Sequence, residues 1–245
     1  MSSVLDPKVV LVTGASSGIG RATALALSKA GATVAVGGRR TDRLEALAQE
    51  APGEILVLDM DVSDPASVRK AVDRTVERFG TLDIVVNNAG IMLTGPILDA
   101  DLAEWTRMVE TNLLGSMYTV HAALPHLLRS RGAVVQISST SGRISSAGAA
   151  VYSATKFGVN AFAEALRQEV TEQGVRVVLV EPGFVSTELA DHITDPARRA
   201  AVRTMAESMR TLQPEDIAAA VVYAVTQPDH VAVNEILVRP TDQSR

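Results

Sequence analysis

A tyrosine and a lysine stand four residues apart in the stretch VYSATKFGVN, at Tyr152 and Lys156. The surrounding residues predict a helix, and residues four apart share one face of a helix. A free phenol has a pKa of about 10 and is a poor base at neutral pH, but a neighbouring ammonium group favours the phenolate. The pair therefore predicts a tyrosine that exchanges protons near pH 7, although a buried ring beside a solvated amine has the same spacing.

A glycine-rich turn, TGASSGIG, follows the apolar run KVVLV near the N-terminus. Gly14 permits a sharp turn, Gly18 lets the backbone approach a pyrophosphate, and Gly20 lets a following helix pack closely on the strand. The spacing GxxxGxG differs from the GxGxxG fingerprint of dinucleotide-binding folds. Taken alone, the segment predicts either a dinucleotide site or an ordinary turn.

Short apolar runs rich in β-branched residues alternate with helical patterns along the whole chain. Continuous apolar runs are typical of parallel strands covered on both faces, and the alternation predicts right-handed crossovers. We expect an α/β fold of the Rossmann type, a doubly wound, seven-stranded parallel sheet with helices on both faces. The strands are expected at 8–14, 32–38, 54–61, 82–90, 133–139, 175–183 and 234–240, and helices at 18–30, 41–51, 64–79, 101–130 and 150–173.

The chain shows no linker, low-complexity tract or repeat, so we expect one domain over residues 1–245. Residues 184–213 interrupt the alternation between the sixth and seventh strands. A long segment of this kind is typical of a substrate lid.

The composition limits the partners. A net charge of -5 argues against a nucleic-acid or anionic-membrane surface. The absence of cysteine excludes disulfides and thiolate metal sites, and the four histidines lack ligand spacing, so we expect no metal. The N-terminal residues are typical neither of a signal peptide nor of a membrane span. We expect a cytoplasmic protein that acts on small molecules.

Several motifs together identify a family. The sequence resembles the short-chain dehydrogenase/reductase family over nearly its whole length, and within that family the segments NNAGIMLTGPI, TNLLGSMY, ALPHLLRS and EILVRPTDQ resemble clavulaldehyde reductases of actinomycetes and related serine or 3-hydroxy acid dehydrogenases. The family motifs are TGxxxGxG at 13–20, NNAG at 87–90, Asn112, Ser139, YxxxK at 152–156 and PG at 182–183.

This resemblance implies four catalytic residues. Tyr152 would exchange the proton, Ser139 would hydrogen-bond the substrate oxygen, and Lys156 would support the tyrosine and bind the nicotinamide ribose. Asn112 would hold a water that connects the lysine to solvent. On its residue type alone, Asn112 is a poor helix former that would also suit a cap or a kink.

The resemblance implies NADP(H) as cofactor, bound at the carboxyl ends of the strands. Arg39 and Arg40 follow the second strand, where no acid stands to repel a 2'-phosphate; two solvated arginines are the alternative. Asp61 would accept from the adenine amine, or would cap its own turn. The expected contacts are Gly14, Ser16, Ser17, Gly18, Ile19, Gly20, Arg39, Arg40, Asp61, Val62, Asn88, Ala89, Gly90, Tyr152, Lys156, Pro182, Gly183, Val185 and Thr187.

The expected activity is NADPH-dependent, reversible reduction of an aldehyde or ketone, with a clavulaldehyde-like metabolite as one substrate. One alternative is an NADP-dependent dehydrogenase of a hydroxy acid or polyol. Another is a non-catalytic dinucleotide-binding regulator, but a regulator does not need Ser139, Tyr152 and Lys156 together. The family resemblance also implies a homotetramer or homodimer.

Overall fold

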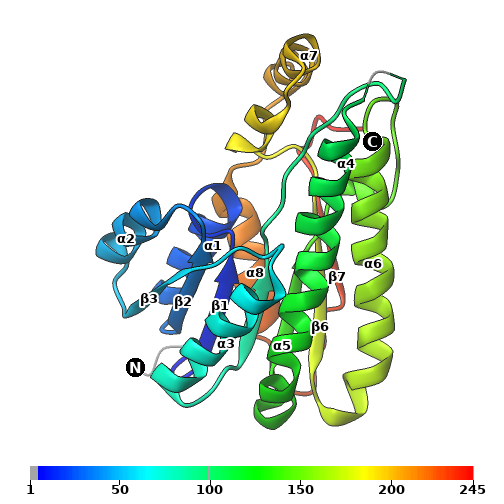
Figure 1. Ribbon diagram of the computed structural model, residues 1–245. Helices are drawn as coiled ribbons and strands as arrows, with labels where there is room; N and C mark the ends of the chain where they lie inside the picture. The colour runs from blue at the N-terminus through cyan, green and yellow to red at the C-terminus, as the bar shows by residue number, and fades with distance from the viewer. Residues whose placement is uncertain (1–4, 99, 245) are drawn as a thin grey trace.

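A twisted parallel sheet forms the centre of the computed structural model, which describes residues 5–98 and 100–244 (Figure 1). Within these residues seven strands pair in the order β3-β2-β1-β4-β5-β6-β7, and every neighbouring pair is parallel. The predicted fold class is confirmed. The strands are β1 (Val9–Thr13), β2 (Thr33–Gly38), β3 (Ile55–Asp59), β4 (Ile84–Asn87), β5 (Ala133–Ile137), β6 (Arg176–Pro182) and β7 (Glu235–Val238).

The strand order reverses between β1 and β4. From β1 the chain winds outward to β3, and it then returns to the other side of β1 and winds outward to β7. In such a sheet, ligands bind outside the carboxyl ends of the strands near this switch point. The glycine-rich turn after β1 and the NNAG segment after β4 therefore lie next to each other.

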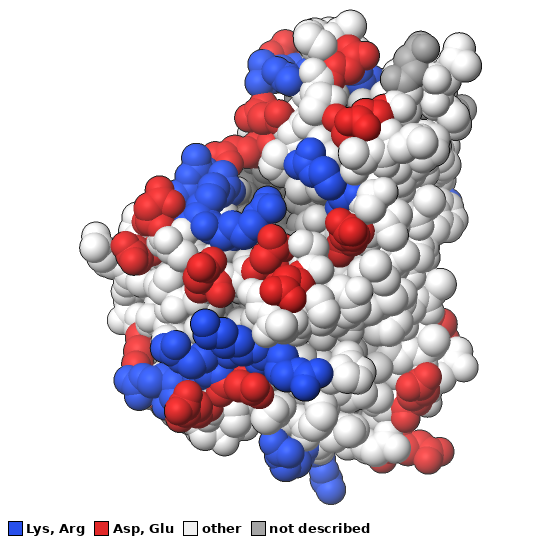
Figure 2. All heavy atoms as spheres, viewed as in Figure 1, with Lys and Arg blue, Asp and Glu red and all other residues white. Residues whose placement is uncertain are grey.

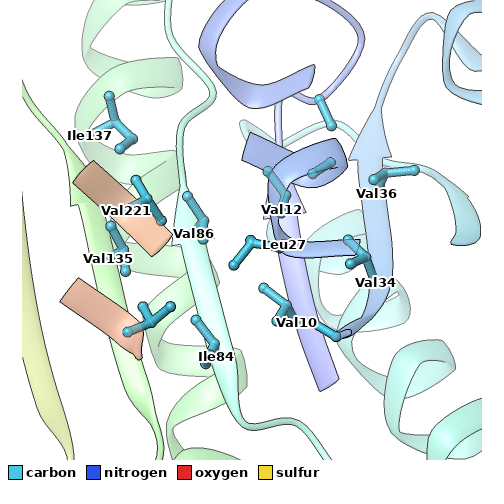
Figure 3. Close-up of a cluster of buried hydrophobic side chains, with 14 of the residues drawn as sticks. Val10, Val12, Leu27, Val34, Val36, Ile84, Val86, Val135, Ile137 and Val221 are labelled. Atoms are coloured by element: carbon cyan, nitrogen blue, oxygen red, sulfur yellow. The ribbon is translucent and has the colours of Figure 1, made fainter. Parts of the chain in front are cut away.

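Two layers of helices bury the two faces of the sheet. Helices α1 (Gly18–Lys29), α2 (Thr41–Glu50) and α8 (Pro214–Val225) pack on one face, where Figure 3 shows Leu27 of α1 and Val221 of α8 among valines of the strands. Helices α3 (Pro65–Phe79), α5 (Gly115–Ser130) and α6 (Ala150–Val170) pack on the other. Burial of these apolar side chains is the main stabilising contribution.

The predicted helix over 101–130 consists of three continuous parts. Helix α4 (Leu102–Met108) continues through a π-helical segment (Val109–Leu114) into α5. Single π-turns inside α-helices are frequently found at functional sites. The helix α8 was not among the predicted ranges, and the last predicted residues of α6 form a short 3-10 turn (Thr171–Gln173).

The sixth strand ends at Pro182, one residue before the expected limit of 183. Pro182 is the last residue of β6 and pairs with Val238 of β7, and Gly183 N donates to the same residue's carbonyl at 2.7 Å. A proline fits here because the pairing of β6 with β5 ends at Val180, so no partner on that side requires an N–H from residue 182.

The segment 184–213 leaves and rejoins the body of the protein at one point. Val185 and Leu212 form a β-bridge, and Ser186 N donates to the Leu212 carbonyl at 2.8 Å. Between them lie a 3-10 helix (Glu188–His192) and α7 (Pro196–Glu207), which stands away from the sheet at the top of Figure 1. Across residues 5–98 and 100–244 no helix is long and apolar enough to cross a membrane.

Candidate active site

Tyr152 and Lys156 lie on the buried side of α6, one turn apart, as the sequence predicts. The Lys156 Nζ atom lies 5.9 Å from the centroid of the Tyr152 ring. Both side chains are buried, and Nζ donates a hydrogen bond of 2.8 Å to the carbonyl of Ile137, the last residue of β5. The lysine therefore joins α6 to the carboxyl end of the sheet.

The acidity of this pair follows from burial. Burial raises the pKa of Tyr152 to about 12, although a hydrogen bond with Ser139 lowers it. Burial lowers the pKa of Lys156 to about 8. The expected lowering of the Tyr152 pKa is therefore wrong for this structure, because desolvation of the phenolate by burial is the largest effect on this group. Tyr152 holds its proton at neutral pH and is placed to act as an acid.

Ser139 lies beside Tyr152 where the chain leaves β5. It is the N-cap of a 3-10 turn (Thr140–Gly142), and its Oγ accepts a hydrogen bond of 3.0 Å from Ser141 N. Its side chain also hydrogen-bonds Tyr152. The structure thus brings together two hydroxyl groups that sequence reasoning assigned to one reacting oxygen.

Asn112 lies in the π-helical segment and is buried. Its amide nitrogen donates to the Ile91 carbonyl at 2.9 Å and to Thr155 Oγ1 at 3.2 Å, and its oxygen accepts from Ile91 N at 2.8 Å. These bonds connect the chain after β4 to α6 at Thr155, which lies between Tyr152 and Lys156 in the sequence. They give a structural reason for an asparagine in this helix; its water-holding role stays a prediction.

A small cavity borders Asn112. Its volume is about 10 Å³, and Asn87 and Gln136 also line it. The Asn87 Oδ1 and Gln136 Nε2 atoms are buried, with no hydrogen-bond partner among the described residues. Buried polar groups of this kind commonly bind a water molecule.

The turn after β1 needs its glycines. Gly14 and Gly18 have φ angles of 65° and 53°, in the left-handed region that favours glycine. A Cβ atom on Gly14 would lie 2.7 Å from Ala89 Cα, and one on Gly20 would lie 2.5 Å from the Gly14 carbonyl oxygen. The roles predicted for Gly14 and Gly20, a sharp turn and close helix packing, are confirmed.

The same turn fits a dinucleotide. Ser17 is the N-cap of α1 and makes no side-chain capping bond, so it leaves the first amides of a 12-residue helix to a ligand. Amides at a helix N-terminus, with the helix dipole behind them, bind phosphate. Ile19 is in the first turn of this helix.

The residues after β4 organise this turn. Thr13 Oγ1 accepts from Asn88 N and Ala89 N at 3.0 and 3.1 Å, and Asn88 Nδ2 donates to the carbonyls of Thr13 and Gly14. Gly90 lies against the Asn112 amide. The Thr13 hydroxyl therefore connects the glycine-rich turn to the chain after β4.

The two arginines after β2 point to different places. Arg40 donates to Ser16 Oγ at 2.9 and 3.1 Å and to Ser17 Oγ at 2.7 Å, so its guanidinium lies on the glycine-rich turn. Arg39 is 69% exposed, and its Nη1 lies 3.8 Å from Asp61 Oδ2. In this structure Arg40, and not Arg39, hydrogen-bonds the serines of the glycine-rich turn.

The remaining predicted contacts lie around the same edge of the sheet. Asp61 Oδ1 accepts from Ser63 N and Oγ at 2.9 and 2.6 Å, so the turn-capping alternative is present. Val62 is buried against Gly115 of α5. A Cβ atom on Gly18 would meet Thr187 Cγ2 at 3.1 Å, which places Thr187 on the glycine-rich turn.

Sequence reasoning missed a buried carboxylate beside the site. Glu181 is 0% exposed; its oxygens accept from Arg143 Nε at 2.6 Å and from Asn160 Nδ2 at 2.8 Å. Asn160 Oδ1 in turn accepts from Ser138 Oγ at 2.5 Å. The network ties α6 to the segment that carries Ser139. An acid within the apolar run VRVVLVEPG was the signal, because a buried charge requires partners.

In the part of the chain that the structure describes, no group of three or more His, Cys, Asp or Glu side chains could hold a metal ion. The residues described above offer hydroxyl, ammonium, amide and guanidinium groups. Such groups can bind anions and move protons.

Comparisons with known proteins agree with this geometry. The chain is 36% identical over 248 residues to an uncharacterized oxidoreductase of Staphylococcus saprophyticus, with 100% of both chains covered. It is 42% identical to glycine betaine reductase of Emericella nidulans. This match covers 98% of this chain but only 19% of that longer protein.

A solved structure shares the whole fold. The closed form of serine dehydrogenase complexed with NADP+ superposes with a TM-score of 0.91 at 33% identity, over 97% of this chain and 96% of that one. Residues 8–198 match the family described as short chain dehydrogenase. The chain therefore belongs to the short-chain dehydrogenase family of oxidoreductases.

Proposed function

We propose that this protein reduces a small aldehyde or ketone to an alcohol with NADPH, in a reversible reaction. The observation that carries the proposal is the group formed by the buried Tyr152 and Lys156 and the half-buried Ser139. It combines a protonated phenol, a second hydroxyl beside it and a lysine with a lowered pKa. This arrangement suits proton donation to an oxygen that gains negative charge.

The protein's own groups would divide the work as follows. The Tyr152 phenol donates its proton to the substrate oxygen, and the Ser139 hydroxyl donates a hydrogen bond to the same oxygen. The Lys156 ammonium stabilises the phenolate that remains, because it lies within 6 Å of the ring. Asn112 would hold a water that returns a proton from solvent, and the cavity beside it supports this role.

The edge of the sheet would hold NADP(H), which supplies the hydride when bound. The glycine-rich turn and the start of α1 would bind the pyrophosphate, Arg39 and Arg40 the 2'-phosphate, and Lys156 the nicotinamide ribose. Asp61 and Val62 would contact the adenine, and the residues after β4 and β6 would line the nicotinamide end. The NADP+ complex of the similar serine dehydrogenase supports this assignment.

The identity of the substrate is also part of this proposal. A reductase is among the relatives, which favours an aldehyde or ketone and keeps a clavulaldehyde-like metabolite among the candidates. The likeness to serine dehydrogenase favours the second candidate function, oxidation of a hydroxy acid. Residues 184–213 would act as the lid over this substrate, and the protein would be a single-domain cytoplasmic homotetramer or homodimer.

A substrate screen tests the proposal. Aldehydes, ketones and hydroxy acids, including a clavulaldehyde analogue and serine, are incubated with NADPH or NADP+ while absorbance at the NADPH band is followed. We expect turnover of at least one carbonyl, and Tyr152→Phe should lower this turnover by about a hundredfold or more. Faster turnover of hydroxy acids would favour the second function, and binding of NADPH with no turnover of any compound would favour a regulator.

A further inference from the structure

Glu188 connects the segment 184–213 to the arginines near β2. Its Oε2 accepts a hydrogen bond of 2.9 Å from Arg40 Nη1. Both of its oxygens accept from Arg43 Nη1, at 2.8 and 3.0 Å. Arg43 lies in the first turn of α2, and Glu188 begins the 3-10 helix of the segment, so the contacts join two parts of the chain that are far apart in sequence.

The groups around Glu188 form an anion site. Arg40 uses its other nitrogens on Ser16 and Ser17, so its guanidinium is held in place on the glycine-rich turn. Arg40 and Arg43 then present donors to the same carboxylate. Figure 2 shows basic and acidic side chains crowded around a hollow near the upper ends of α1 and α2.

A site that binds a carboxylate in this way also suits a phosphate. Guanidinium groups bind both anions through paired, charge-assisted hydrogen bonds. The hydrogen bonds from Arg40 and Arg43 hold the pKa of Glu188 below its usual value, so this side chain is an anion at neutral pH. A phosphate that approaches Arg40 therefore meets an arginine that already has an anionic partner.

We infer that Arg43 binds the 2'-phosphate of NADP(H) together with Arg40, and that Glu188 competes with this phosphate for both arginines. The inference rests on the proposed use of NADP(H). When NADP(H) binds, its 2'-phosphate replaces the Glu188 carboxylate at the two arginines. The measured affinity for NADP(H) then reflects the difference between the arginine–phosphate and the arginine–carboxylate contacts. A nucleotide without the 2'-phosphate leaves the Glu188 contacts in place and is unaffected by them.

Binding of two adenosine nucleotides tests this inference without catalysis. Adenosine 2',5'-bisphosphate and AMP differ only in the 2'-phosphate, and titration calorimetry gives the Kd of each for the full-length protein. Glu188→Gln should bind the bisphosphate roughly two- to tenfold more tightly, as expected for loss of exposed ion pairs. Arg43→Ala should bind it about three- to tenfold more weakly. Both variants should bind AMP like the wild type.

Asp191 offers a matched control. It lies in the same 3-10 helix, but its carboxylate accepts from Arg203 Nη2 at 2.6 Å, within the segment 184–213. Asp191→Asn removes an exposed charge of the same sign close to Glu188 and should leave both Kd values unchanged. An equal gain in this variant would attribute the effect to net charge and overturn the inference.

The outcomes separate the inference from the function on which it rests. A wild type that prefers the bisphosphate, with Glu188→Gln no tighter or Arg43→Ala no weaker, would overturn the competition and leave the NADP(H) proposal standing. A wild type that binds both nucleotides equally would overturn the proposed cofactor preference and the inference with it. Tightening of both nucleotides by Glu188→Gln would also contradict a contact specific to the 2'-phosphate.

Discussion

Lys156 and Tyr152 share one face of α6, yet the lysine donates a hydrogen bond to the carbonyl of Ile137 at the end of β5. The Lys156 Nζ atom lies 5.9 Å from the centroid of the phenol ring, a distance at which a charge can favour the phenolate without a direct hydrogen bond. Because both groups are buried, this charge is screened less than it would be in water. The same burial makes each group costly to ionise, and that cost sets the behaviour of the pair with pH.

Tyr152→Phe should lower kcat by on the order of a hundredfold or more, the usual effect of losing a general acid. The ring keeps its packing, so the Kd for NADPH, measured by fluorescence, should stay within about twofold of the wild type. Tyr223→Phe, at an exposed tyrosine of α8, is the control and should change neither value. Turnover of Tyr152→Phe close to that of the wild type would contradict the assigned role.

Lys156 should make the folded protein more stable as the pH rises above 8. Its pKa is about 8 when folded and 10.5 when unfolded, so between these values the unfolded chain binds the extra proton. The free energy of unfolding then increases with pH, on the order of 1 kcal/mol per pH unit. Urea titrations at pH 7 to 10 should show this increase in the wild type relative to Lys156→Met. Parallel curves for the two proteins would refute the lowered pKa.

Arg143→Ala should destabilise the fold by about 2–4 kcal/mol, because it leaves the buried Glu181 carboxylate without its cationic partner. The effect stays below that of a fully buried pair, since the arginine is partly exposed and Asn160 still donates to Glu181. Glu235→Gln removes the exposed partner of the same arginine and should cost less than about 1 kcal/mol. Equal losses in the two variants, measured by urea denaturation, would contradict this order.

Arg39→Ala should raise the KM for NADPH roughly ten- to a hundredfold, the effect of one charged hydrogen bond, and leave that for NADH nearly unchanged. The Arg39 side chain is exposed and only loosely paired with Asp61, so it is available to a phosphate. Steady-state kinetics with both cofactors measure the two constants. A wild type that prefers NADH would show that the residues after β2 do not recognise the phosphate.

Gly20→Ala should weaken both the fold and the binding of NADPH. Its Cβ atom would lie 2.5 Å from the Gly14 carbonyl oxygen, and backbone at that distance must shift. Overpacking of this kind typically costs 1–3 kcal/mol. At Gly95 a Cβ atom has nothing within 4 Å, so Gly95→Ala should stay within about 0.5 kcal/mol of the wild type. Thermal melts with and without NADPH measure both effects.

Strand and helix positions were predictable because the relevant interactions are local or periodic. Runs such as VVLV are apolar at every residue because both faces of the sheet are covered, and the structure places the strands within three residues of the expected limits. The glycine-rich turn was predictable for a similar reason, since a positive φ angle favours glycine at Gly14 and Gly18.

Properties that depend on three-dimensional surroundings were not predictable from spacing. The shift in the Tyr152 pKa depends on how completely α6 and the sheet bury the phenol, and residue spacing carries no measure of burial. The contacts of Glu181 join β6, α6 and the segment after β5, which only the folded chain brings together. The bond from Arg40 to Ser16 depends equally on the packing of β2 beside β1.

The bridge between Val185 and Leu212 means that 186–211 is an insertion with adjacent ends. A segment of another length or sequence can start and finish at the same two residues without moving β6 or α8, and the cost of closing a loop grows only slowly with its length. The two apolar clusters that cover the faces of the sheet, and Ser139, Tyr152 and Lys156, lie outside this insertion. If this segment is the proposed substrate lid, substrate preference could change by exchange of one surface segment without alteration of the residues at the carboxyl ends of the strands.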